Sequence, residues 1–112
     1  MLNKQIEILL SEALGAPTRV CKKVSAWEIN SNAEIVLETN YENEAVQACV
    51  WLPIEFKTRT LGPNLILYPE GKGRHSNTYP SKGLEKGKAA IKVKLNDTID
   101  AEKIITAIEW PK

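Results

Sequence analysis

The chain has 112 residues, of which 43% are hydrophobic and 26% are charged, and its formal net charge is +1. This length suits one domain and is too short for two ordinary ones, so we expect a single domain over residues 1–112. The composition excludes a disordered chain, which needs low hydrophobicity and a large net charge. A nearly neutral balance gives no global attraction to nucleic acid or membranes, so any electrostatic preference must be local.

The first residues carry Glu7 where a secretory signal would have its apolar run, and no apolar stretch is long enough to cross a bilayer. We therefore expect a cytoplasmic protein with no membrane partner. The two cysteines, Cys21 and Cys49, follow no metal-ligand spacing. In a reducing compartment the expected state is two buried thiols rather than a disulfide.

Both ends of the sequence carry helical patterns. Over residues 2–13 the apolar side chains recur on one face, and Gly15 supplies the stop. Near the other end, Asp100 is the expected N-cap of the second helix. Ile99 and Ile104 have the spacing of a hydrophobic staple around that cap.

Five segments between the helices have the composition of strands: 18–29, 34–39, 44–52, 64–68 and 91–95. The last segment alternates apolar residues with Lys92 and Lys94, so one of its faces is predicted to be wet. Segment 44–52 is apolar on both faces and is predicted to be central or covered. The order α-β-β-β-β-β-α predicts an α+β fold, with an antiparallel five-stranded meander and two terminal helices packed on one face.

The loop over residues 71–88 is the most unusual segment. It holds five lysines and arginines against one glutamate, a local balance of 5 − 1 = +4, and four of the six glycines. Glycine lets a backbone approach a ligand, and an arginine fork grips a phosphate with two bonds. The candidate ligand-binding residues are Lys72, Arg74, His75, Ser76, Asn77 and Lys82. The alternative, an ordinary solvated connection, stays open.

Catalysis has weaker support. His75 is followed by a serine, but adjacent residues seldom point toward each other as a nucleophile and its base must. Glu55 and Lys57 match half of a metal-dependent nuclease pattern, whose missing aspartate would have to be replaced by Glu34 or Glu38. One histidine and two separated cysteines give no set of metal ligands. We therefore assign no catalytic residue, no metal and no cofactor.

The leading hypothesis is a small non-enzymatic binding module whose loop 71–88 receives an anionic small molecule or nucleic acid. An alternative is a homodimeric structural or protein-interaction protein, because strand 44–52 has an apolar second face and Trp110 lies at the end of the last helix. A small hydrolase or nuclease is a third possibility. The sequence does not identify the ligand.

Overall fold

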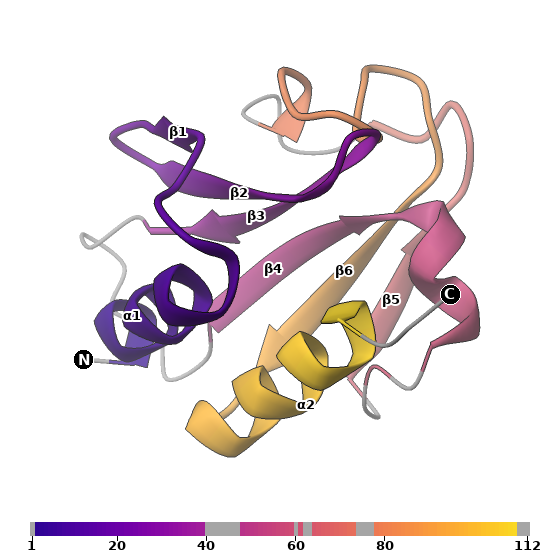
Figure 1. Cartoon of the computed structure of the whole chain (residues 1–112). Coiled ribbons are helices and arrows are strands. Elements are labelled where there is room, and N and C mark those ends of the chain that lie inside the picture. Colours follow the sequence, from indigo (N-terminus) through magenta and orange to yellow (C-terminus); the bar gives the residue numbers. More distant parts are fainter. Residues whose placement is uncertain (1, 40–47, 60, 62–63, 74–77, 110–112) are drawn as a thin grey trace.

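The computed structural model describes residues 2–39, 48–59, 61, 64–73 and 78–109. Its elements are α1 (Leu2–Leu14), β1 (Arg19–Val20), β2 (Val24–Asn30), β3 (Ala33–Glu38), β4 (Ala48–Pro53), the 3₁₀ helix η1 (Ile54–Thr58), β5 (Leu65–Tyr68), β6 (Ala90–Leu95) and α2 (Thr98–Glu109) (Figure 1). The strands form one antiparallel sheet in the order β1-β2-β3-β4-β6-β5. The predicted α+β class with an antiparallel sheet and two helices is confirmed. Within the described residues the sheet has six strands, so the prediction of five is wrong.

The sixth strand arises because segment 18–29 is broken by a tight turn. The backbone N–H of Cys21 donates a 2.8 Å hydrogen bond to the carbonyl of Val24, which folds β1 back onto β2. The turn contains two lysines, whose charges favour exposure. Cys21 is consequently exposed, and the expectation of a buried thiol is wrong for this residue, whereas Cys49 is half-buried.

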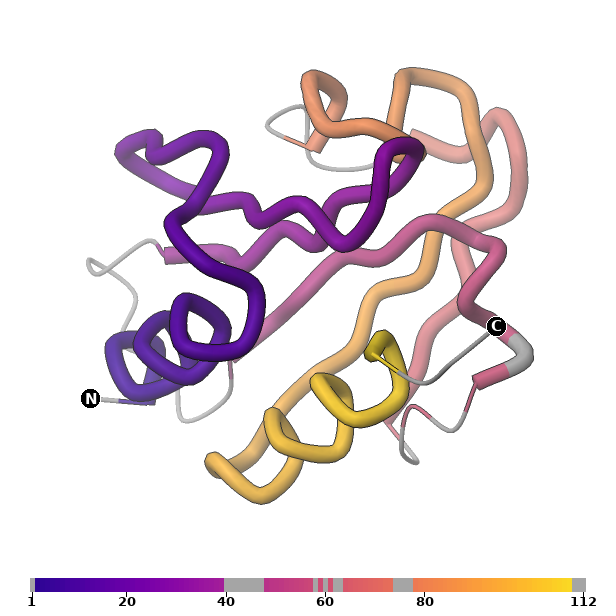
Figure 2. The backbone as a smooth tube through the Cα atoms, in the orientation of Figure 1, coloured from indigo at the N-terminus to yellow at the C-terminus, as the bar shows by residue number. Residues whose placement is uncertain are grey.

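The predicted meander is wrong at one place, because β6 lies between β4 and β5 and pairs with both. The chain therefore leaves β4 through η1, forms the edge strand β5, and returns later to fill the gap (Figure 2). Phe56 and Leu61 in this connection are only 2% and 3% exposed and belong to the core. A link that carries core residues cannot form the short hairpin turn that a meander requires.

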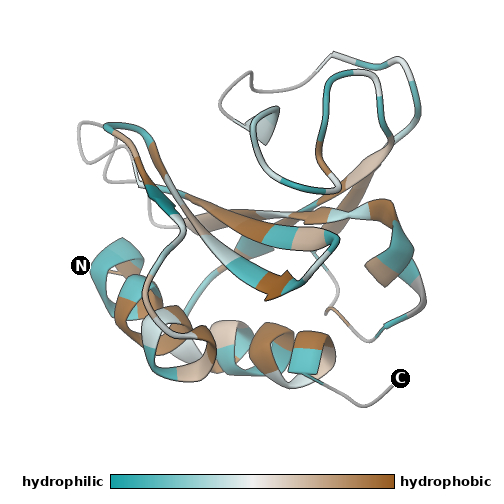
Figure 3. Cartoon of the chain, turned by 45° about the horizontal axis from the view of Figure 1, so that its top comes forward, coloured by the Kyte–Doolittle hydropathy of each residue, from teal (hydrophilic) through white to brown (hydrophobic). Residues whose placement is uncertain are grey.

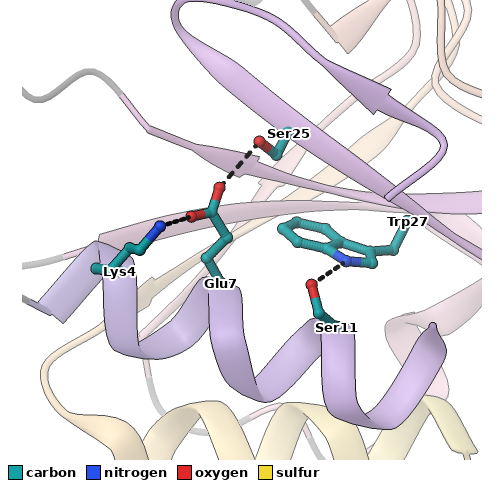
Figure 4. A network of polar contacts seen from close by, with 5 residues as sticks. All are labelled: Lys4, Glu7, Ser11, Ser25 and Trp27. Atoms are coloured by element: carbon teal, nitrogen blue, oxygen red, sulfur yellow. Dashed lines mark hydrogen bonds and ion pairs between the residues drawn. The ribbon is translucent and has the colours of Figure 1, made fainter. Parts of the chain in front are cut away.

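The main core joins residues of both helices to alternate residues of the sheet. Figure 3 shows the helices on one side of the sheet and the long loop on the other. We call these two sides the helix face and the loop face. Polar bonds fix α1 on the helix face (Figure 4). The indole N–H of Trp27 donates to Oγ of Ser11 at 3.1 Å, and Ser25 donates to Glu7 at 3.2 Å. Glu7 also accepts a 3.5 Å contact from Lys4.

The second helix begins earlier than the sequence predicts. Asp97, not Asp100, caps it, because Oδ1 of Asp97 accepts a 2.9 Å hydrogen bond from the N–H of Asp100. Asp100 in turn accepts a 2.9 Å bond from the N–H of Asn96, the residue before the cap. Ile99 lies inside the first turn and is 60% exposed, so the expected staple around Asp100 is wrong.

Candidate functional site

Two of the six candidate ligand-binding residues, Lys72 and Lys82, fall in the described part of loop 71–88, and both are exposed. The other four, Arg74, His75, Ser76 and Asn77, lie outside the described residues. Trp110, on which the homodimer alternative partly rests, lies outside them as well.

The described stretch 78–88 of this loop packs on the loop face of the sheet. Leu84 is fully buried and joins a second apolar cluster with Val36 and Trp51. Polar bonds hold the stretch in place, because Nη2 of Arg19 donates a 2.8 Å bond to Oγ of Ser81. The backbone N–H of Glu34 in β3 also donates a 3.0 Å hydrogen bond to the carbonyl of Lys82. This stretch is therefore folded structure that covers part of the apolar second face of β4.

Gly83 has a structural reason to be glycine. Its φ of +86° is a conformation that other residues rarely adopt, and an added Cβ would lie 2.6 Å from Cγ of Pro53. The carbonyl oxygen of Asn32 would be 3.3 Å from the same Cβ. The loop thus approaches the end of β4 so closely that no side chain fits between them.

A cavity of about 460 Å³ opens where this loop passes the β2–β3 turn and η1, and its lining is Ser31, Asn32, Pro53, Ile54, Glu55, Lys82, Gly83, Glu85, Lys88 and Ala89. Its two lysines already face carboxylates, since Lys82 lies 3.4 Å from Glu28 and Lys88 lies 3.3 Å from Glu85. The N–H of Gly83 also donates to Glu85 at 3.1 Å. The pKa of Glu85 is lowered because, although partial burial opposes its ionisation, hydrogen bonds from backbone N–H groups and Lys88 outweigh that effect. The cavity is therefore close to neutral.

The strand register aligns one row of side chains across the open part of the loop face. Ile66 of β5 pairs with Lys92 of β6, which pairs with Trp51 of β4. In the next row Tyr68 contacts Trp51 edge-on, with ring centroids 4.9 Å apart. The Nζ of Lys72 lies 4.8 Å from the centroid of the Tyr68 ring. We call Tyr68, Lys72, Lys92 and Lys94 together the Tyr68 patch.

The charge of the Tyr68 patch is unevenly balanced. Glu38 is a carboxylate beside it, accepting a 2.7 Å bond from the indole N–H of Trp51 and lying 3.9 Å from Nζ of Lys92. Lys92 also lies over the Trp51 ring, 5.2 Å from its centroid. Lys72 and Lys94 form no ion pair with a carboxylate in the described part of the chain. The patch thus combines an aromatic ring with cations that are incompletely neutralised.

Cys49 lies beside this patch, because the register pairs it with Lys94. Burial raises the pKa of its thiol, and the negative charge of Glu38 raises it further. The neighbouring lysines 92 and 94 oppose this shift. The thiol is therefore the protonated form at neutral pH and adds no charge to the patch.

The sequence pattern placed Lys92 and Lys94 on a wet face, but it did not associate them with Tyr68. Their proximity depends on the insertion of β6 between β4 and β5, which brings residues of three strands together. Tyr68 and Trp51 were therefore missed as site residues. The strand segments containing them were visible, but the pairing of those strands was not.

Of the residues that suggested catalysis, Glu34, Glu38, Glu55 and Lys57 are described, whereas His75 lies outside the described residues. Glu55 and Lys57 are both exposed, and Glu38 is engaged with Trp51. Glu34 is 8% exposed and stands opposite Glu28 in the β2–β3 register. Within the described ranges, no group of three or more His, Cys, Asp or Glu side chains could hold a metal ion.

Comparison with known proteins identifies no relative: no family model, no curated protein and no solved structure matches the chain. Among the described residues, no helix has both the length and the apolarity needed to cross a membrane.

Proposed function

We propose that this chain is a non-enzymatic binding module that holds a single strand of nucleic acid on the Tyr68 patch. The observation that carries the proposal is the position of Lys72, whose Nζ lies 4.8 Å from the Tyr68 ring centroid. Lys72 is exposed, so its ammonium is free to move onto a phosphate and leave the ring face to a base. Stacking of one base on an aromatic side chain contributes about 1–3 kcal/mol to binding.

The neighbouring charges support the same ligand. Lys92 and Lys94 alternate along β6 on the face that carries Tyr68, so their ammonium groups follow the strand direction. Loop 71–88, which carries Lys72, has a sequence balance of +4. The proposal takes both helices to lie on the opposite face, which leaves the loop face for the ligand.

An extended anion fits this arrangement better than a compact one. The cavity beside loop 82–89 would suit a small molecule, but its two lysines already pair with Glu28 and Glu85. The Tyr68 patch instead offers a line of cations beside a ring, which is how proteins follow a single-stranded backbone without reading its sequence. A cytoplasmic location, where nucleic acid is accessible, remains part of this prediction.

The test is a titration of labelled single-stranded oligonucleotides of about 12 nucleotides at several salt concentrations. Affinity should fall as salt rises, because binding releases counterions, and Lys94→Gln should reduce the log–log slope by about 0.7. Tyr68→Leu should weaken binding at every salt concentration without changing the slope. Lys57→Gln removes one exposed charge from η1 and is the matched control.

Three outcomes would count against the proposal. Absence of binding at low salt would remove nucleic acid from consideration. If Lys57→Gln and Lys94→Gln lowered the affinity equally, binding would depend on the overall positive charge and not on a defined site. If inorganic phosphate bound as tightly as the oligonucleotide, the ligand would instead be a small phosphate compound.

A further inference from the structure

The outer edge of β5 offers backbone hydrogen-bonding groups with no partner in the described part of the chain. The N–H of Lys94 donates a 3.1 Å bond to the carbonyl of Asn64, which fixes the alternation of the β5–β6 ladder. Residues 64, 66 and 68 therefore direct their backbone groups toward β6. Leu65 and Leu67 direct theirs outward, and among the described residues no further hydrogen bond involves either one.

This edge is also apolar. Ile66 is 38% exposed and Leu67 is 50% exposed, and no residue of β5 is charged. Natural edge strands are normally protected by charged residues, by prolines or by being very short. The other edge strand, β1, has two residues and includes Arg19, whereas β5 has four. Of the two edges, β5 is the more open to another strand.

We infer that β5 pairs antiparallel with β5 of a second copy, across a two-fold axis through Ile66. In that register Leu65 faces the partner copy's Leu67, and Leu67 faces its Leu65. Each of these two pairs exchanges two hydrogen bonds, so all four outward donors and acceptors of each strand are satisfied. Ile66 then packs against its own equivalent on the loop face.

The flanking prolines single out this register. Pro63 and Pro69 have no N–H, so neither can donate to a ladder. Moving the axis to residue 67 would place Leu65 opposite Pro69 and lose hydrogen bonds. Moving it to residue 65 would place Leu67 opposite Pro63, with the same loss. In the register about Ile66 neither Leu65 nor Leu67 faces a proline, so every outward N–H and C=O of these two residues has a partner and β5 is complementary to a second copy of itself.

The inference is independent of nucleic acid and is tested first by self-association. Sedimentation velocity should find a dimer population that grows with protein concentration. Leu67→Lys places a charge in the interface and should weaken self-association about tenfold or more. Ile8→Lys is the matched control, because Ile8 on α1 is 49% exposed and lies far from β5 in the sequence.

A second variant addresses the hydrogen bonds rather than the apolar contact. Leu67→Pro removes an outward N–H and keeps an apolar side chain, so the ladder with β6 is retained while the dimer is lost. Thermal unfolding of both Leu67 variants verifies that each is folded at the temperature of the sedimentation experiment.

Cross-linking tests the register directly. In a chain carrying Cys21→Ser and Cys49→Ala, Ile66→Cys should form a disulfide-linked dimer on mild oxidation. Opposed residues in a non-hydrogen-bonded pair have Cα atoms about 4.5 Å apart, within disulfide range. Val20→Cys, at a position 68% exposed on the opposite edge, gives the amount of cross-linking that random collision produces. Equal cross-linking of the two variants, or a monomer at concentrations up to about 1 mM, would overturn the inference.

Discussion

Trp51 donates its indole N–H to Oε2 of Glu38 at 2.7 Å, across the boundary between β3 and β4. Trp51 is 2% exposed, so removing its acceptor would leave a largely buried donor unpaired. Glu38→Ala should therefore lower the free energy of unfolding by about 1–3 kcal/mol, the usual cost of leaving a buried donor unsatisfied. Urea denaturation followed by circular dichroism measures the change.

The matched control for Glu38 is Glu28, a glutamate whose carboxylate is close to half exposed and pairs with Lys82. Exposed ion pairs contribute roughly 0–1 kcal/mol, so Glu28→Ala should change stability little. Glu38→Gln keeps an acceptor for the indole and should fall between the two. Equal losses for Glu28→Ala and Glu38→Ala would contradict this account of Trp51.

A second buried indole makes a similar prediction on the helix face. Trp27 is fully buried and its N–H has Ser11 of α1 as acceptor at 3.1 Å. Ser11→Ala should cost about 1–3 kcal/mol of stability, even though alanine is the better helix former. Glu12→Ala, at an exposed position of the same helix, is the control. An unchanged midpoint for Ser11→Ala would contradict the role of this bond in anchoring α1.

Two glycines with the same backbone conformation allow the cost of backbone strain to be measured separately from the cost of a steric overlap. Gly71 and Gly83 have φ values of +84° and +86°, but an added Cβ meets nothing within 4 Å at Gly71. Gly71→Ala should cost about 1–2 kcal/mol from the left-handed conformation alone. Gly83→Ala should cost a further 1–3 kcal/mol or so, because its Cβ overlaps Pro53. Melting temperatures that fall equally would show that the contact with Pro53 relaxes freely.

The thiol of Cys49 reports the electrostatics beside the Tyr68 patch. Because burial and Glu38 raise its pKa above the ordinary value of 9.0, its alkylation by iodoacetamide should begin at higher pH than for an unperturbed thiol. Glu38→Gln should shift that onset to lower pH, and Lys94→Gln to higher pH. Peptide mass spectrometry resolves Cys49 from the exposed Cys21. A pH profile that is the same in both variants would contradict the assigned causes.

The same pKa shift has a consequence for stability. The folded state retains the Cys49 proton to higher pH than the unfolded chain does. Its stabilising contribution is therefore complete below pH 9 and is lost as pH rises through the folded-state pKa. Cys49→Ser should reduce the slope of stability against pH in this alkaline range.

Local patterns in the sequence were sufficient to predict most elements but not their pairing. The apolar periodicity of α1 and the alternation in β6 each lie within one short segment of the sequence. Both elements could therefore be predicted from the sequence. The position of β6 between β4 and β5 depends on contacts between distant segments. The Tyr68 patch depends on that pairing, so its residues could not be grouped from the sequence.

Where a local prediction failed, two similar signals competed. Asp97 and Asp100 are both suitable N-caps, and the structure uses Asp97, with the helix beginning at Thr98. Likewise the β-branched composition of segment 18–29 concealed a turn at Cys21. In both cases the choice was decided by individual hydrogen bonds, which composition does not reveal.

The order of the strands also determines when the sheet can be completed on the ribosome. β6 joins β4 to β5, yet it leaves the exit tunnel after the other five strands of the described sheet. A nascent chain without residues 90–95 can form the β2–β3 and β3–β4 pairs, but the far edge of β4 has no neighbour and β5 has no strand to join. That unfinished edge lies along Val50, Trp51 and Leu52, so an apolar strand edge stays unpaired until β6 emerges.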